Sequence, residues 1–83
     1  MKHNITRDGC DYQAEIEVDG STETVKVTDV NNDMVGTITI DNNMEEIHYI
    51  RDDQETGTLQ YHEFKGTQCA IHTAKWLIDT SYQ

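Results

Sequence analysis

The sequence predicts an α+β fold: an antiparallel meander sheet of four to five strands with one C-terminal helix packed on one face. Two patterns carry this prediction. Residues 12–64 form short segments in which apolar and polar residues alternate, and Gly, Asn or Asp residues separate the segments. Thr67–Tyr82 instead shows the 3.6-residue apolar period of an amphipathic helix. Short turns between successive strands favour antiparallel pairing, which gives the order βββββα in a single domain over residues 1–83.

The segment Tyr12–Asp19 has the most regular alternation of the chain. Its apolar face is formed by Tyr12, Ala14, Ile16 and Val18, and its polar face by Gln13, Glu15, Glu17 and Asp19. We therefore expect a half-buried strand with an acidic outer face.

Glu23–Val30 is expected to return beside this strand as the second half of a hairpin. If Gly20-Ser21 is the two-residue loop, Glu15 lies opposite Lys26, and the apolar pairs are Ile16 with Val25 and Ala14 with Val27. A loop at Asp19-Gly20 keeps the same faces but loses the charge pair. The sequence therefore favours the first register.

Three further strands and the helix complete the expected fold. The strands are Val35–Ile40, Ile47–Arg51 and Leu59–Phe64, with a polar loop at 52–57 before the last. Residues 1–10 carry only an Asp8-Gly9 turn signal and are expected to be irregular. Thr67 is the expected N-cap of the helix. The predicted core consists of Ile16, Val25, Val27, Ile38, Ile47, Ala74, Leu77 and Ile78. A four-stranded sheet, with the last segment as an irregular edge, is the alternative.

The chain of 83 residues is strongly acidic, with 16 Asp and Glu against 6 Lys and Arg and a net charge of −10. This balance excludes a general nucleic-acid binder, which needs a basic surface, and it disfavours binding to an anionic membrane. It fits a partner protein with a basic surface. The same balance is also expected if the acids only keep a small protein soluble, or if the host is halophilic.

Neither a membrane span nor a secretory signal is expected, because no apolar run reaches about 18 residues and the first twelve residues lack an apolar core. The two cysteines, Cys10 and Cys69, are too few for a disulfide scaffold. We therefore expect a cytoplasmic protein.

The candidate partner-binding residues are the acids Glu15, Glu17, Asp19, Asp52, Asp53 and Glu55. The first three recur every second residue, about 6.6 Å apart along a strand, which is of the same order as the spacing of phosphates along a nucleic acid. A rigid row of carboxylates can occupy an Arg- and Lys-lined groove in place of phosphates. The acids of the loop, Asp52, Asp53 and Glu55, are expected to extend this negative surface. The simpler interpretation is an ordinary solvated strand face.

Metal binding and a disulfide are the weaker candidates. Cys69 and His72 have the i, i+3 spacing of one helix side, and Cys10, His48 or His62 would complete a zinc site. Cys69 is equally typical of a small buried hydrophobe. We expect no metal, no cofactor and no Cys10–Cys69 disulfide.

Two clusters of histidine or aromatic residues are further candidate contact surfaces. With Arg51 opposite Leu59, His48 and His62 would face each other beside an apolar patch of Ile50 and Phe64. Trp76, with Tyr82, would either close the edge of the core or anchor an interface. The simpler interpretation of the histidines is a surface pair on an edge hairpin, and no oriented partner for acid–base catalysis is visible.

The functional prediction is therefore a non-enzymatic inhibitor that binds a basic, nucleic-acid-handling surface of a host protein. In size, charge and lack of motifs the chain resembles the small acidic proteins that phages encode against host defence, such as anti-CRISPR proteins. That resemblance covers no specific residue. A structural or adaptor subunit of a larger assembly is the alternative, and an enzyme or metal protein comes third. A homodimer through an edge strand is a further expectation.

Overall fold

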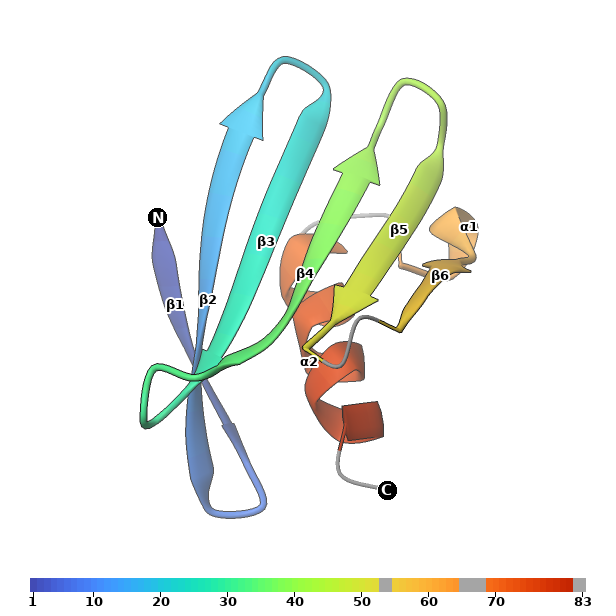
Figure 1. The fold of residues 1–83 in the computed structure, drawn as a ribbon. Coiled ribbons are helices and arrows are strands. Elements are labelled where there is room, and N and C mark those ends of the chain that lie inside the picture. The colour runs from blue at the N-terminus through green and yellow to red at the C-terminus, as the bar shows by residue number, and fades with distance from the viewer. Residues whose placement is uncertain (53–54, 65–68, 82–83) are drawn as a thin grey trace.

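The computed structural model describes residues 1–52, 55–64 and 69–81 of the chain. Six antiparallel strands follow one another across one sheet in sequence order, and a C-terminal helix packs against one face (Figure 1). The predicted meander and its helix are confirmed, with six strands instead of four or five. The elements are β1 (Lys2–Arg7), β2 (Cys10–Asp19), β3 (Thr22–Asp29), β4 (Met34–Asp41), β5 (Glu46–Arg51), β6 (Thr56–Leu59), α1 (Tyr61–Phe64) and α2 (Cys69–Ser81).

The β2–β3 hairpin has the predicted register. Glu15 pairs with Lys26, Ile16 with Val25 and Ala14 with Val27. Asp19 pairs with Thr22, which leaves Gly20-Ser21 as the loop. Gly20 has a φ of 63°, and a positive φ at the first loop residue is what a type II′ turn requires.

The prediction that residues 1–10 are irregular is wrong, because Lys2–Arg7 forms strand β1 beside β2. The Asp8-Gly9 turn joins the two strands, with φ values of 52° and 80°. Positive φ at both positions is the requirement of a type I′ hairpin turn. Only Ile5 of this strand is buried, so the segment has no run of alternating apolar residues that would reveal a strand.

The predicted strand Leu59–Phe64 is also wrong. The sixth strand, Thr56–Leu59, begins within the predicted loop at 52–57 and ends where the predicted strand was to begin, and Tyr61–Phe64 is one turn of helix. Gly57 pairs with Tyr49, and a Cβ at Gly57 would meet the Tyr49 hydroxyl oxygen at 2.5 Å. A glycine is unfavourable in an isolated strand, but here its missing side chain makes room for the tyrosine ring.

A bulge shapes β4 where it meets the helix. Gly36 pairs with Val27 and Met34 with Thr28, so Val35 is the extra residue and is buried. A Cβ on Gly36 would lie 2.8 Å from Leu77 Cδ2. The helix therefore approaches the sheet more closely at this position than a side chain would allow.

The core lies between the inner face of the sheet and α2. Of the eight predicted core residues, Ile16 is half-buried, and the other seven are buried: Val25, Val27, Ile38, Ile47, Ala74, Leu77 and Ile78. Thr73 is fully buried too, and its hydroxyl donates to the Ala70 carbonyl oxygen at 2.9 Å. The expected cap Thr67 and the aromatic Tyr82 lie outside the described residues.

The helix is shorter than the strands that it covers. The 13 residues of α2 span about 20 Å, whereas the 10 residues of β2 span about 33 Å. The sheet therefore extends beyond the helix, and Val18, on the inner face near the end of β2, is 66% exposed. None of the helices in the described part of the chain has the length and apolar character needed to cross a membrane.

Candidate partner-binding surface

The sheet face turned away from α2 carries the predicted acidic row. Strand pairing orders its side chains into rows that cross the sheet. One row is Lys2–Glu15–Lys26–Thr37–Ile50–Thr56, the next is Glu17–Thr24–Thr39–His48–Thr58, and the last is Asp19–Thr22–Asp41–Glu46. The many threonines fit this position, because β-branched side chains suit an exposed strand.

The three acids of β2 have different neighbours. Glu15 stands between Lys2 on one side and Lys26 on the other, with strands about 4.8 Å apart. Its negative charge is therefore compensated from both strands. Glu17 and Asp19 are exposed and lie opposite threonines on β3. These two carboxylates dominate the charge at their end of β2.

More acids gather at the same end of the sheet, where the β2–β3 and β4–β5 turns lie (Figure 1). We call this surface the acidic end, and it consists of Glu17, Asp19, Asp41, Glu45 and Glu46. The prediction from sequence missed its last three members. Adjacent acids at a turn have no distinctive pattern, and only the strand register shows that they lie at the same end of the sheet as Asp19.

Hydrogen bonds hold the two turns of the acidic end together. The Asn42 amide N–H donates to the Ser21 carbonyl oxygen at 2.9 Å, and Asn42 Nδ2 donates to the Glu23 carboxylate at 2.8 Å. Asp41 Oδ1 accepts the amide N–H groups of Asn43 and Met44, each at 3.0 Å. The turns therefore form a connected support for the acids.

The predicted loop acids lie elsewhere. β5 runs from Glu46 at the acidic end to Arg51 at the opposite end, where Asp52 and Glu55 follow. Glu55 Oε2 also lies 3.9 Å from Arg51 Nε. The structure does not bring Asp52 and Glu55 to the β2 row, and Asp53 lies outside the described residues.

The predicted pairing of His48 with His62 across two strands is wrong. His48 lies opposite Thr58, and its Nε2 is 3.3 Å from Glu46 Oε2. His62 is on α1, and its Nε2 is 3.3 Å from Glu45 Oε2. Each histidine therefore stands beside one carboxylate of the acidic end.

The apolar patch expected around Ile50 and Phe64 is not formed either. Ile50 belongs to the outer face and is 50% exposed. Phe64 packs against the core from α1. The two side chains therefore have different surroundings.

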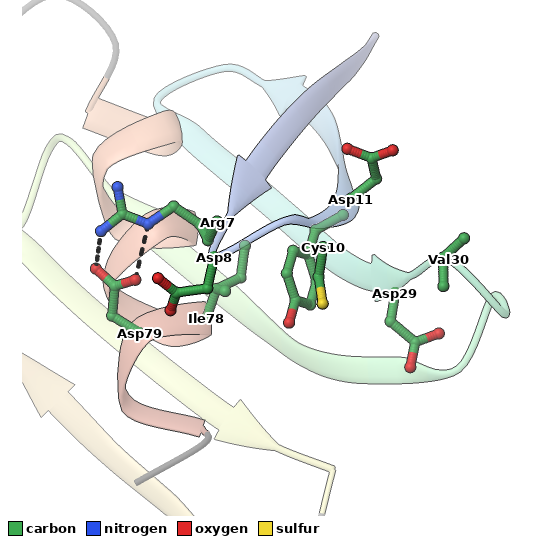
Figure 2. A pocket seen from close by; sticks show the side chains of 9 residues that line it. Arg7, Asp8, Cys10, Asp11, Asp29, Val30, Ile78 and Asp79 are labelled. Atoms are coloured by element: carbon green, nitrogen blue, oxygen red, sulfur yellow. Dashed lines mark hydrogen bonds and ion pairs between the residues drawn. The ribbon is translucent and has the colours of Figure 1, made fainter.

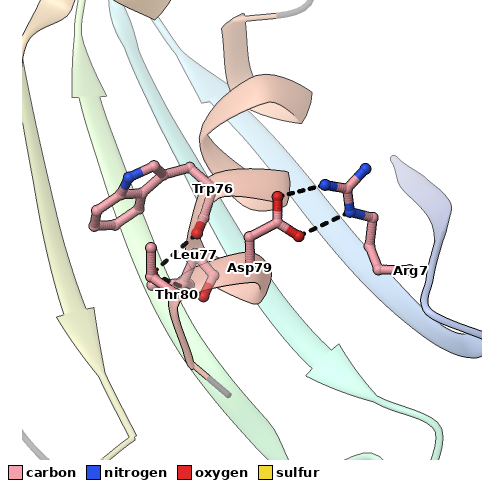
Figure 3. A network of polar contacts seen from close by, with 5 residues as sticks. All are labelled: Arg7, Trp76, Leu77, Asp79 and Thr80. Atoms are coloured by element: carbon pink, nitrogen blue, oxygen red, sulfur yellow. Dashed lines mark hydrogen bonds and ion pairs between the residues drawn. The ribbon is translucent and has the colours of Figure 1, made fainter. Parts of the chain in front are cut away.

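Trp76 closes one edge of the core. Its ring lies edge-on to Tyr49 with centroids 5.1 Å apart, and the Arg51 guanidinium carbon lies 5.1 Å from the Trp76 centroid. Arg51 Nη2 donates to Thr80 Oγ1 at 2.6 Å. Thr80 in turn donates to the Trp76 carbonyl oxygen at 3.0 Å (Figure 3). These contacts give Trp76 a packing role.

Both cysteines are free thiols. Cys69 is 8% exposed, and burial, together with the charge of Glu23, raises the pKa of its thiol. It thus matches the interpretation as a small buried hydrophobe. Within residues 1–52, 55–64 and 69–81, no group of three His, Cys, Asp or Glu side chains is arranged to hold a metal ion.

The acidic end thus offers exposed carboxylates on a hydrogen-bonded strand framework, an arrangement suited to binding cationic groups by charge and hydrogen bonding. Lys2 and Lys26 limit this negative surface on the side of Glu15. Comparisons of the chain with protein-family models, with curated proteins and with solved structures found no match.

Proposed function

We propose that this protein is a non-enzymatic binding protein whose acidic end docks on a basic surface of another protein. The observation that carries the proposal is the gathering of Glu17, Asp19, Asp41, Glu45 and Glu46 at one end of the sheet. The net charge of −10 supports the same partner chemistry.

Two physical effects favour such docking. Carboxylates on a strand are already positioned, so their binding costs less ordering entropy than binding by a flexible acidic tail. Long-range attraction toward a basic partner also raises the association rate. Salt reduces this rate gain, because charges farther apart than the Debye length, about 10 Å at 0.1 M, are largely screened.

The partner surface that we propose is one that handles nucleic acid in a host cell, so that docking inhibits it. Alternate carboxylates about 6.6 Å apart on β2 are spaced on the order of backbone phosphates, and Arg and Lys side chains bind both groups by the same hydrogen bonds. An inhibitor encoded by a phage against host defence is one protein of this kind.

The test is affinity against salt for a partner isolated on the immobilised protein and then purified. The variant Glu17→Gln/Asp19→Asn removes two charges from the acidic end, and Asp52→Asn/Glu55→Gln removes two from the opposite end as a matched control. We expect the first pair to weaken binding about tenfold at low salt and the control pair to have little effect. We expect Glu15→Gln to weaken binding less than replacement of Glu17 or Asp19, because Lys2 and Lys26 lie on both sides of Glu15.

Equal affinity of all variants, with no salt dependence, would reject docking through the acidic end. Competition separates the proposed inhibitor from the adaptor subunit: duplex DNA or structured RNA should displace an inhibitor from a nucleic-acid groove. A partner that binds the protein and nucleic acid simultaneously would indicate an adaptor.

A further inference from the structure

We propose that a hollow at the opposite end of the molecule binds an arginine side chain of a partner protein, as a second site that does not depend on the acidic end. The hollow has a volume of about 540 Å³ and lies between the β1–β2 turn, the β3–β4 turn and the last turns of α2 (Figure 2). The residues that define it are Arg7, Asp8, Tyr12, Asp29, Ile78 and Asp79.

The hollow exists because the sheet continues past the end of the helix. Tyr12 and Ile78, which are 6% and 2% exposed, form an apolar floor. Val30, which is 73% exposed, adds an apolar group at the rim. Such a floor accepts the aliphatic part of a long side chain.

The negative charge of the lining residues favours a cation as the ligand of this hollow. Four carboxylates line it, Asp8, Asp11, Asp29 and Asp79, against the single cation Arg7. Arg7 Nε donates to Asp79 Oδ1 at 2.8 Å and Nη2 donates to Asp79 Oδ2, so this pair is bidentate (Figures 2 and 3). The Asp79 carboxylate also raises the pKa of Arg7, which keeps the pair charged. The other three carboxylates have weaker partners: Asp11 accepts from Thr6 Oγ1, Asp29 Oδ1 accepts two amide N–H groups of the β3–β4 turn, and Asp8 also raises the pKa of Arg7. With four carboxylates against one cation, the lining keeps a net negative charge.

Arginine matches this combination better than lysine or a metal ion. A guanidinium group binds carboxylates in a planar, bidentate manner and is weakly hydrated, whereas an ammonium group is a compact, strongly hydrated charge. A metal ion would gain nothing from the apolar floor. The volume also lies within the range of about 300–1,000 Å³ typical of ligand sites, so the hollow has room for the arginine and part of the neighbouring backbone.

The probe for this site is acetyl-arginine methylamide, with the neutral acetyl-citrulline and acetyl-norleucine methylamides as matched controls. Backbone amide NMR shifts locate binding, and the alkylation rate of Cys10, an exposed thiol that lines the hollow, provides a second readout. Cys69 is buried and should react slowly, so the two thiols are distinguishable. We expect the arginine probe to shift amides near Asp8, Val30 and Asp79 and to protect Cys10.

The test variant is Asp8→Asn/Asp29→Asn. Asn tolerates the positive φ of 52° at position 8. At position 29 its side-chain oxygen can still accept the amide N–H groups of Asn31 and Asp33. We expect about tenfold weaker arginine binding in this variant. The Glu17→Gln/Asp19→Asn variant has the same change in charge at the far end of β2, and its arginine binding should be unchanged.

Binding of citrulline or norleucine as tight as that of arginine would overturn the charge selection. Unchanged arginine binding in a folded Asp8→Asn/Asp29→Asn variant would overturn the site itself. Neither result would affect docking through the acidic end, since that surface is tested by different variants.

Discussion

Arg51 is the single side chain that does most to join the sheet to the end of the helix. It is 13% exposed and lies against both Tyr49 and Trp76, with its guanidinium carbon 5.2 and 5.1 Å from their ring centroids. It also donates to the Leu77 carbonyl oxygen at 3.5 Å, near the carbonyl-rich end of α2. Its charge thus interacts with two aromatic rings, with the end of a helix and with the Glu55 carboxylate.

We predict that Arg51→Met lowers the free energy of unfolding by about 1–3 kcal/mol, because methionine keeps an apolar stem but loses the charged donors. Urea unfolding followed by circular dichroism measures the change. Lys75→Met, at an exposed position of α2, is the control and should shift the midpoint little. Equal urea midpoints for Arg51→Met and Lys75→Met would show that Arg51 does not stabilise the contact between the sheet and α2.

At the scale of elements, α2 is held to the sheet along its middle and at its last turn. Ala74, Leu77 and Ile78 are buried along one side. At the last turn, Asp79 points to Arg7 of β1 while Thr80 lies on the other side of the helix (Figure 3). Thr80 accepts a hydrogen bond from Arg51 of β5. The helix is therefore linked to strands on both sides of the sheet.

We predict that Leu77→Ala lowers the free energy of unfolding by about 2–5 kcal/mol. Leu77 is fully buried beside Gly36, which has no side chain that could fill the cavity left by the substitution. In a domain of this size the predicted loss is a large share of the total stability. His72→Ala, exposed on the same helix, provides the comparison. A melting curve for Leu77→Ala that matched that of His72→Ala would contradict the observed packing.

At the scale of the whole molecule, charge is distributed unevenly. Glu15 and its flanking lysines balance one part of the outer face, whereas the acidic end and the hollow each concentrate carboxylates. Like charges held close together in the folded state repel each other more strongly than in the expanded unfolded chain. The net charge of −10 should therefore cost folding stability at low ionic strength.

We predict that raising sodium chloride from about 0.01 M to about 0.5 M increases the free energy of unfolding, because the Debye length falls from about 30 Å to a few Å. Urea titrations at the two salt concentrations measure this effect. The Glu17→Gln/Asp19→Asn variant should be more stable than the wild type at the low salt concentration and should gain less stability when salt is added. A fall in wild-type stability with salt would mean that attractive pairs outweigh the repulsion.

The sequence by itself determined the elements whose signals are local. The alternation of Tyr12–Asp19 and the Gly20-Ser21 loop were enough to predict the β2–β3 register, because both the face and the turn are set by residues close in the chain. The period of α2 likewise predicted its buried side. The acidic row of β2 could be proposed on the same basis.

Only the tertiary structure decided the features that depend on distant residues. β1 is a strand because β2 pairs with it, and β6 includes Gly57 because the Tyr49 ring fills the space of a side chain. Strand register also places Lys2 as a second lysine beside Glu15. It adds Glu46 to the acidic end and separates Asp52 and Glu55 from that end. The hollow beside Tyr12 arises from the different lengths of sheet and helix, a relation between elements that no local pattern of residues contains.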